Sequence, residues 1–191
     1  MNRLMAQYST SEIRGGHKVE VDGEPYTVVS NEFVKPGKGQ AFNRIKLKHL
    51  LTGRVIDRTF KSGERLDSAD VEETKMRLLY KDGEHAIMMD DTSFEQISIP
   101  LSTLQDKAQW LMDDQVYDVV LYKGAPVDVI PPTFMEMKIA ETVPGVRGDT
   151  SGRVLKPAVT ENGTNVQVPL FINEGDVIKI DTRTGEYVSR V

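Results

Sequence analysis

The sequence predicts an all-β protein built from three consecutive small barrels. Short runs of alternating apolar and polar residues recur along the chain, turn residues separate them, and they group into three blocks of about sixty residues. A length of 191 residues allows anything from one large domain to three small ones. We place the blocks at residues 1–67, 68–131 and 132–191, and we expect neighbouring blocks to stabilise each other because cores this small are marginal.

In the first block we predict a hairpin, two further strands and a linker. Residues 17–29 form the hairpin, because an Asp-Gly pair at their centre suits a type I′ turn. Residues 42–50 alternate as a half-buried strand does, with Ile45 and Leu47 on one face. The other face is entirely basic and carries Arg44, Lys46 and Lys48. A strand at 54–60 follows, and the polar stretch 61–70 is predicted to be a linker.

The second and third blocks repeat the pattern. Five strands are predicted in the second block, at 75–80, 85–89, 94–100, 115–122 and 125–130. Residues 100–114 predict its one helix, because Leu104, Ala108 and Leu111 recur at roughly helical spacing and Ser102 can cap the first turn. Two prolines end the block, since proline cannot donate to a continuing strand ladder. Strands of the third block are predicted at 134–140, 165–172, 176–181 and 186–191.

The charge is distributed unevenly along the chain. The formal net charge is -5, yet residues 1–66 hold 12 Lys and Arg against 7 Asp and Glu, a net +5. Residues 67–131 carry -9 and residues 132–191 carry -1. A basic first third on an acidic chain fits an RNA contact confined to that third, because phosphate contacts dominate nucleic-acid affinity. A merely dipolar surface explains the same numbers equally well.

Composition excludes several classes of site. The chain has no Cys, which rules out disulfides, thiolate zinc sites, iron–sulfur clusters and a Cys nucleophile, and its three His are scattered. No apolar run approaches the roughly 20 residues of a spanning helix, and the first ten residues lack the apolar core of a secretory signal. We therefore expect a cytoplasmic protein with no metal site, no bound cofactor and no membrane contact.

The segment FVKPGKGQAFNR, residues 33–44, is the most informative motif. Glycines and a proline surround Lys38 between two strand-like runs, which predicts an exposed hairpin tip from which the lysine projects. Many hairpin tips are rich in these residue types, so composition alone leaves a purely structural turn open. A phosphate-binding P-loop is excluded, because G-x-x-x-x-G-K-[ST] is absent.

Several longer segments carry a family resemblance. FVKPGKGQAF, followed by KLKHLLTGRVIDRTFKSGE, resembles the first domain of bacterial elongation factor P. The third domain of that family is similar to PPTFMEMKI, PGVRGDTSGRVLKPA and VPLFINEGDVIKIDTRTGEYVSRV. The resemblance covers essentially the whole chain in order. It implies an SH3-like (KOW-like) first barrel and two OB-folds, arranged as an elongated L.

The resemblance also implies a function. Members bind the ribosome, touching both subunits, beside peptidyl-tRNA, and they relieve stalling at consecutive prolines by positioning the CCA end of the tRNA. The chain is then expected to be a monomer without catalytic residues, because peptidyl transfer stays with ribosomal RNA and positioning alone lowers a barrier. Lys38 matches a lysine that a modifying enzyme extends in many members, for example with a β-lysyl group.

The resemblance further assigns roles to individual residues. The tip loop consists of Lys35, Pro36, Gly37 and Gly39 around Lys38, and RNA backbone is contacted by Arg44, Lys46 and Lys48. A loop of the last domain approaches the mRNA codon in the exit site and matches Gly148, Asp149 and Thr150. By composition alone these three residues are an ordinary turn. Tyr187 and Arg190 fit the family's C-terminal pattern as further contacts, although Tyr187 also suits a core position.

A general single-stranded RNA-binding protein built from OB-folds is the alternative function. It requires tight, salt-sensitive binding to free oligonucleotides, which the acidic middle block and the nearly neutral last block disfavour. An enzyme ranks third, because no nucleophile, metal set or acid–base pair can be assembled. The paired carboxylates at 90–91 and 113–114 are typical of turns, and Trp110 is expected in the core of the second block.

Overall fold

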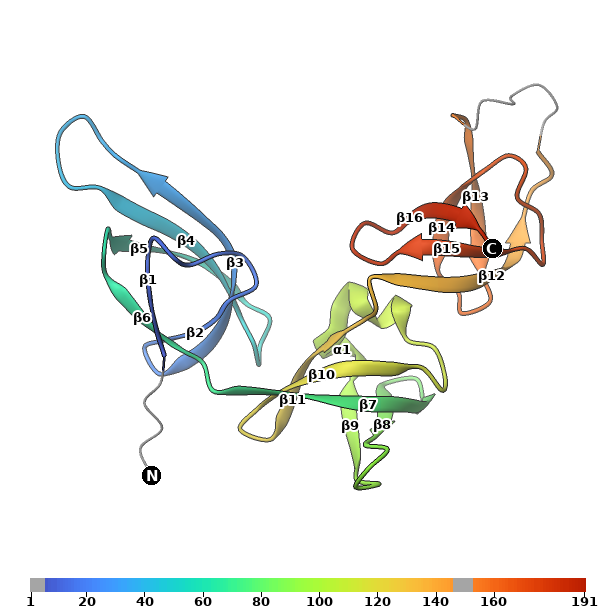
Figure 1. Cartoon of the computed structure of the whole chain (residues 1–191), viewed down its shortest axis with the longest axis horizontal. Helices are drawn as coiled ribbons and strands as arrows, with labels where there is room; N and C mark the ends of the chain where they lie inside the picture. The colour runs from blue at the N-terminus through green and yellow to red at the C-terminus, as the bar shows by residue number, and fades with distance from the viewer. Residues whose placement is uncertain (1–5, 146–152) are drawn as a thin grey trace. The chain divides into compact units, whose positions relative to one another are not determined.

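The computed structural model describes residues 6–145 and 153–191. Its strands form three sheets in which neighbouring strands are mainly antiparallel (Figure 1). This confirms the all-β prediction and its three groups of strands. By contacts the chain divides into two compact units, Met1–Thr74 with Val119–Asp128, and Lys75–Asp118 with Val129–Val191. Strands of the middle sheet belong to both units, so the boundaries at 67/68 and 131/132 stay a prediction.

The N-terminal sheet has six strands in the order β1-β6-β2-β3-β4-β5. They are β1 (Gln7–Ser9), β2 (Lys18–Val21), β3 (Glu24–Val34), β4 (Phe42–His49), β5 (Val55–Lys61) and β6 (Arg65–Ser68). The core lies on one face, where Val19, Ile45 and Leu47 are fully buried together with Ile13 and Phe60. As predicted, β2 and β3 join through Asp22 and Gly23, both of which have a positive φ.

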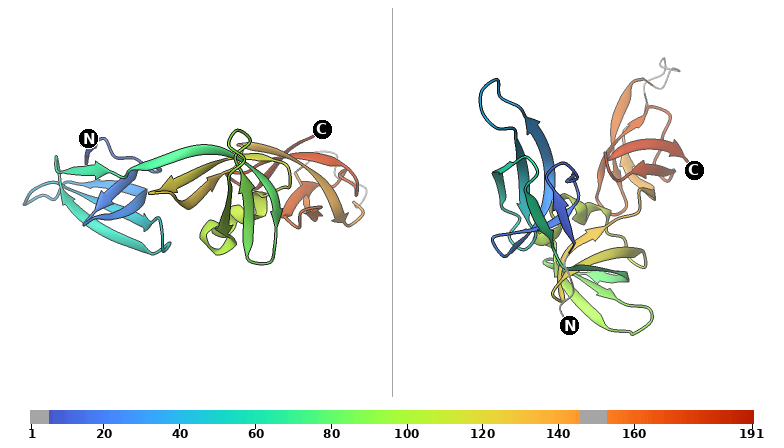
Figure 2. Two further views of the ribbon diagram at one scale, coloured as in Figure 1. Left: turned by 90° about the horizontal axis from the view of Figure 1, so that it is seen from below. Right: turned by 60° about the vertical axis from the view of Figure 1, so that its left-hand side comes forward.

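Strands β3 and β4 form a long hairpin, the β3–β4 arm, whose strand β4 also pairs with β5 from Phe42 opposite Lys61 to Lys48 opposite Val55. The loop of this arm projects from the rest of the sheet in all three views (Figures 1 and 2). The pairing runs without interruption from Ser30 opposite Lys46 to Val34 opposite Phe42. Nearer the core a bulge between Val28 and Ser30 shifts the register. Such bulges bend a strand and strengthen its twist. The sheet thus carries the loop 35–41 on a continuous ladder of backbone hydrogen bonds.

The middle sheet has five strands in the order β11-β10-β7-β8-β9. They are β7 (Val71–Lys81), β8 (His85–Met89), β9 (Gln96–Pro100), β10 (Val116–Tyr122) and β11 (Ala125–Ile130). Between β9 and β10 lie α1 (Leu101–Leu104) and the 3-10 segment η1 (Gln105–Trp110). The last sheet has the order β14-β13-β12-β15-β16. Its strands are β12 (Phe134–Thr142), β13 (Leu155–Thr160), β14 (Asn165–Pro169), β15 (Val177–Asp181) and β16 (Glu186–Arg190).

Three local expectations were wrong or incomplete. The stretch 61–70 is not a plain linker, because β6 pairs with β1 and β2 and buries Leu66 in the core. The predicted helix 100–114 is a four-residue α-turn followed by a 3-10 segment, and the residue at its N-cap is Pro100 without a side-chain cap, so Ser102 does not cap it. Strands β1 and β13 had no sequence prediction; each is defined by pairing with a partner strand.

Candidate nucleic-acid interface

The loop 35–41 closes the β3–β4 arm and carries Lys38. Because Val34 pairs with Phe42, these seven residues form the whole connection between the strands. The Lys38 side chain is exposed, as are Lys35, Gly37 and Gly39 beside it, while Pro36 is half-buried. Gly39 has a φ of 110°, a conformation that favours glycine, and a Cβ there would lie 3.8 Å from the Pro36 ring. The chain therefore presents an exposed ammonium group in the loop at the end of the β3–β4 arm.

The basic strand β4 has the predicted alternation. Ile45 and Leu47 are fully buried, Arg44 and Lys46 are exposed, and Lys48 is half-buried. Two of these cations have acidic neighbours across the ladder. Arg44 Nη1 lies 3.9 Å from Glu32 Oε2, and Lys46 is the register partner of Asp57. Exposed ion pairs of this kind are weak, so a phosphate group can compete with Glu32 for Arg44.

Sequence reasoning missed the polar network under the arm. Asn43 is 4% exposed and donates its side-chain amide to Asn31 Oδ1 at 2.9 Å. Asn31 in turn donates to the carbonyls of Thr10 at 2.8 Å and Ile13 at 3.0 Å. The network ties the arm to the connection between β1 and β2. Its one sequence signal was asparagine at an inward-facing position of β4, where the alternation calls for an apolar residue.

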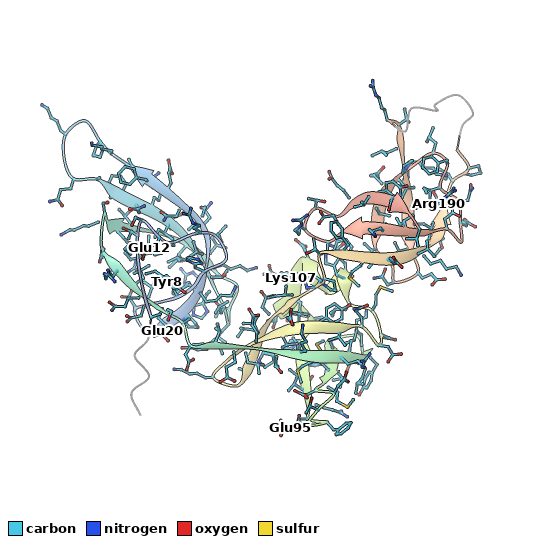
Figure 3. All side chains as sticks on the ribbon, viewed as in Figure 1. Tyr8, Glu12, Glu20, Glu95, Lys107 and Arg190 are labelled. Carbon is cyan, nitrogen blue, oxygen red and sulfur yellow. The ribbon has the colours of Figure 1, made fainter. Side chains whose placement is uncertain are left out.

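The C-terminal candidates lie on β16 of the last sheet, where Figure 3 labels Arg190. Tyr187 is half-buried. Arg190 is exposed, and its guanidinium lies 5.6 Å from the centre of the Phe171 ring and 4.0 Å from Asp176 Oδ2. An exposed arginine within cation–π distance of an aromatic ring offers a nucleobase both a charged and an apolar contact. The predicted mRNA loop of Gly148, Asp149 and Thr150 lies outside the described residues.

Other conspicuous residues have structural roles. Trp110 is buried, as expected for a core anchor, and its ring lies 4.0 Å from where a Cβ on Gly185 would stand. Asp90 Oδ1 accepts hydrogen bonds from the backbone of Thr92 and Ser93, which is an ordinary turn. Within 6–145 and 153–191, no group of three His, Asp or Glu is placed to hold a metal ion. Over the same residues, no helix has the length and apolarity that crossing a bilayer requires.

Family models match three consecutive parts of the chain. Residues 9–66 match the elongation factor P KOW-like domain, residues 71–129 the elongation factor P OB domain, and residues 135–190 the elongation factor P C-terminal domain. The arm, its loop and β4 all lie in the first match.

Individual relatives match over nearly full length. Elongation factor P 2 of Protochlamydia amoebophila is 68% identical over 188 residues, covering 98% of this chain and 99% of the relative. Elongation factor P 2 of Chlamydia caviae is 61% identical with the same coverage. Among solved structures, the translation initiation factor 5A from Methanococcus jannaschii is 19% identical, with a TM-score of 0.49 over 66% of this chain and 97% of that one.

Three domain models in the expected order and relatives above 60% identity agree with the all-β architecture of three sheets. The chain therefore belongs to the elongation factor P family and is a non-catalytic translation elongation factor.

Proposed function

We propose that this elongation factor binds the ribosome beside peptidyl-tRNA and restores peptide-bond formation where consecutive prolines stall synthesis. Lys38 is the positioning group. The observation that carries the proposal is its exposed place in the loop 35–41, between glycines and at the end of a paired arm. An ammonium group in that place can donate hydrogen bonds to phosphate and ribose oxygens at the tRNA CCA end.

The proposed mechanism is geometric. Proline has a rigid ring and a secondary amine, so few arrangements of a peptidyl-prolyl-tRNA are reactive. Holding the CCA end in one of them removes orientational freedom before the reaction, and well-oriented reactants can gain several kcal/mol of barrier. Lys38 needs no acid–base role, and the peptidyl transferase of the ribosome performs the chemistry. Lys35, Pro36, Gly37 and Gly39 shape the loop around it.

Further contacts complete the proposed interface. Arg44, Lys46 and Lys48 on β4 hold RNA backbone, which the net charge of +5 over residues 1–66 supports. Gly148, Asp149 and Thr150 approach the mRNA codon in the exit site, and Tyr187 and Arg190 add contacts from β16. The factor acts in the cytoplasm as a monomer that touches both ribosomal subunits, through three domains at 1–67, 68–131 and 132–191.

We further propose that a modifying enzyme extends Lys38, for example with a β-lysyl group. The exposure of the side chain supports this, because an enzyme must reach the amine. The test is the intact mass of protein purified from its native host, with sequencing of the peptide that contains Lys38. A mass excess on that peptide supports the modification, and an unmodified lysine contradicts it without touching the positioning role.

The test of the function compares Lys38→Ala with a matched variant, Lys123→Ala. Lys123 is also an exposed lysine followed by glycine at a hairpin tip, between β10 and β11. In reconstituted translation of a polyproline template, Lys38→Ala should lose the stimulation and Lys123→Ala should keep it. Both variants should translate a proline-free template at the wild-type rate. Full stimulation by Lys38→Ala would refute the assignment.

A further inference from the structure

We infer that a cavity near the loop end of the β3–β4 arm binds one unpaired nucleobase of RNA, with Phe33 as the stacking surface and Arg14 as the phosphate contact. The inference rests on the proposed function for the class of ligand, and it adds an RNA contact that is separate from Lys38 and from the basic face of β4. The cavity has a volume of about 310 Å³, at the lower end of the range for ligand pockets.

Three parts of the N-terminal sheet form the cavity walls. Ser11 and Arg14 come from the connection between β1 and β2, Phe33 and Asn43 from the inner face of the arm, and Ser62 follows β5. Phe33 and Asn43 are register partners, so their side chains project from the same face of the sheet. The cavity therefore lies beyond the buried core, one residue pair from the loop end of the β3–β4 ladder.

Phe33 supplies a flat apolar wall that the protein leaves open. It is 59% exposed, although it shares its face with the buried Asn43. No aromatic or cationic ring contact to it occurs among the described residues. An exposed aromatic ring beside a basic surface is the usual stacking platform for single-stranded nucleic acid, because every base presents a π-face.

The polar groups of the cavity fit a nucleotide. Arg14 is exposed, and its guanidinium has no ion pair or hydrogen bond within the described part of the chain, so it is free to bind a phosphate. The Ser62 hydroxyl can donate to or accept from the edge of a base. Asn43 Oδ1 is buried and has no hydrogen-bond partner among the described residues. Leaving such an acceptor unpaired is costly, which marks this wall as polar rather than as core.

The positive charge around the cavity does not by itself distinguish RNA from an acidic peptide as the occupant. Charge and the shape of the cavity together favour RNA. The surrounding residues 1–66 carry a net +5, which attracts either anion. Glu12 is the one acidic residue of this connection, and its Oε2 accepts the backbone N–H of Ser9 at 2.9 Å. A flat ring, one free guanidinium and hydroxyl groups around a small cavity match one base and its phosphate better than an extended chain of carboxylates.

The test is a titration of the full-length chain, labelled for NMR, with adenosine monophosphate and with a short single-stranded oligoadenylate. Chemical-shift changes should concentrate at the residues that line the cavity. Phe33→Leu keeps apolar bulk but removes stacking, and it should weaken oligoadenylate binding at least about fivefold, the lower end of what one stacked base contributes. Phe33→Trp should retain binding, and Arg14→Gln should weaken it.

Two matched variants provide the controls. Phe94 is 70% exposed and lies outside the N-terminal sheet, so Phe94→Leu should bind like wild type. Arg54, exposed beyond the opposite end of β4, makes Arg54→Gln the control for the loss of one positive charge. The inference is overturned if Phe33→Leu binds oligoadenylate as wild type does, or if an acidic peptide shifts the cavity residues and the nucleotides do not.

Failure of this inference and failure of the proposed function are separable. Lys38→Ala should bind adenosine monophosphate at the cavity normally while losing polyproline stimulation. If Lys38→Ala loses stimulation and Phe33→Leu binds nucleotide as wild type does, the cavity inference is refuted and the proposed function stands. If Phe33→Leu loses nucleotide binding and Lys38→Ala keeps full stimulation, the proposed function is refuted and the cavity inference stands.

Discussion

Asn31 and Asn43, on neighbouring strands of the arm, are joined by a hydrogen bond of 2.9 Å from Asn43 Nδ2 to Asn31 Oδ1. Asn31 extends this hydrogen-bond network, because its own amide donates to the carbonyls of Thr10 and Ile13. Thr10 is itself fully buried, and its hydroxyl oxygen accepts the Gly63 N–H at 2.9 Å. The arm that carries Lys38 is thereby fastened to two other connections of its sheet.

Removing the Asn31 amide should loosen the base of the arm. Asn31→Ala leaves two carbonyls and the Asn43 amide without their partner, at a cost of about 1–3 kcal/mol for buried groups. Because several compact parts need not unfold together, the measurement is hydrogen exchange of the β3 and β4 amides rather than one global transition. Asn165→Ala, at an exposed position of β14, is the control and should leave those amides unchanged. Equal protection in both variants would contradict the fastening role.

Tyr117 should make stability fall at high pH. Burial raises the pKa of Tyr117 to about 12. Its hydroxyl donates to the Trp110 carbonyl at 2.5 Å and accepts the Met112 N–H at 2.8 Å. In the unfolded chain the phenol ionises near pH 10, so between about pH 10 and 12 the unfolded state releases a proton that the folded state keeps. Ionisation of this group therefore lowers stability as pH rises through that window, and below the window its contribution to stability does not change with pH.

The measurement compares denaturant unfolding of wild type and Tyr117→Phe below pH 10 and again inside the window. The variant loses two hydrogen bonds, so wild type should be more stable at the lower pH by about 1–3 kcal/mol. That advantage should shrink as the pH approaches 12. An advantage that stays constant across the window would show that Tyr117 ionises normally.

Gly145, which follows β12, lies close to the backbone of Leu170. A Cβ built there would overlap the carbonyl oxygen of Leu170, so Gly145→Ala forces the backbone to move. Overpacking of this kind costs about 1–3 kcal/mol. Gly83→Ala is the control, because a Cβ there would meet nothing within 4 Å. Calorimetry should show at least one unfolding transition at a lower temperature for Gly145→Ala alone, and equal transition temperatures for both variants would contradict the crowding.

Local patterns predicted the parts of the fold that local chemistry decides. The alternation of Ile45 and Leu47 with basic residues gave β4 its inward and outward faces, and the glycines around Lys38 gave the exposed loop. Strand β6 escaped prediction because its evidence is remote: Gln7 pairs with Asp67, sixty residues later. A polar segment becomes a strand when a distant partner satisfies its backbone.

Hydrogen bonds between elements that are far apart in the sequence could not be predicted from it either. The Gln109 carbonyl accepts hydrogen bonds from Asn162 Nδ2 and Thr164 Oγ1, both at 2.8 Å, across more than fifty residues of chain. The buried tyrosine Tyr122 donates to Glu20 Oε1 at 3.2 Å, one hundred and two positions away; Figure 3 labels Glu20. Glu32 beside Arg44 and the cavity at Phe33 likewise follow from strand register, which periodicity alone does not fix.

The position of Lys38 on the ribosome is the most direct test of the proposed function. The chain has no cysteine, so Lys38→Cys provides a unique attachment point for a hydroxyl-radical probe, and Lys123→Cys provides the matched control. With peptidyl-prolyl-tRNA stalled on the ribosome, the probe at position 38 should cleave the CCA end of that tRNA, and the probe at position 123 should not. Cleavage confined to other RNA segments from position 38 would contradict the positioning role of Lys38.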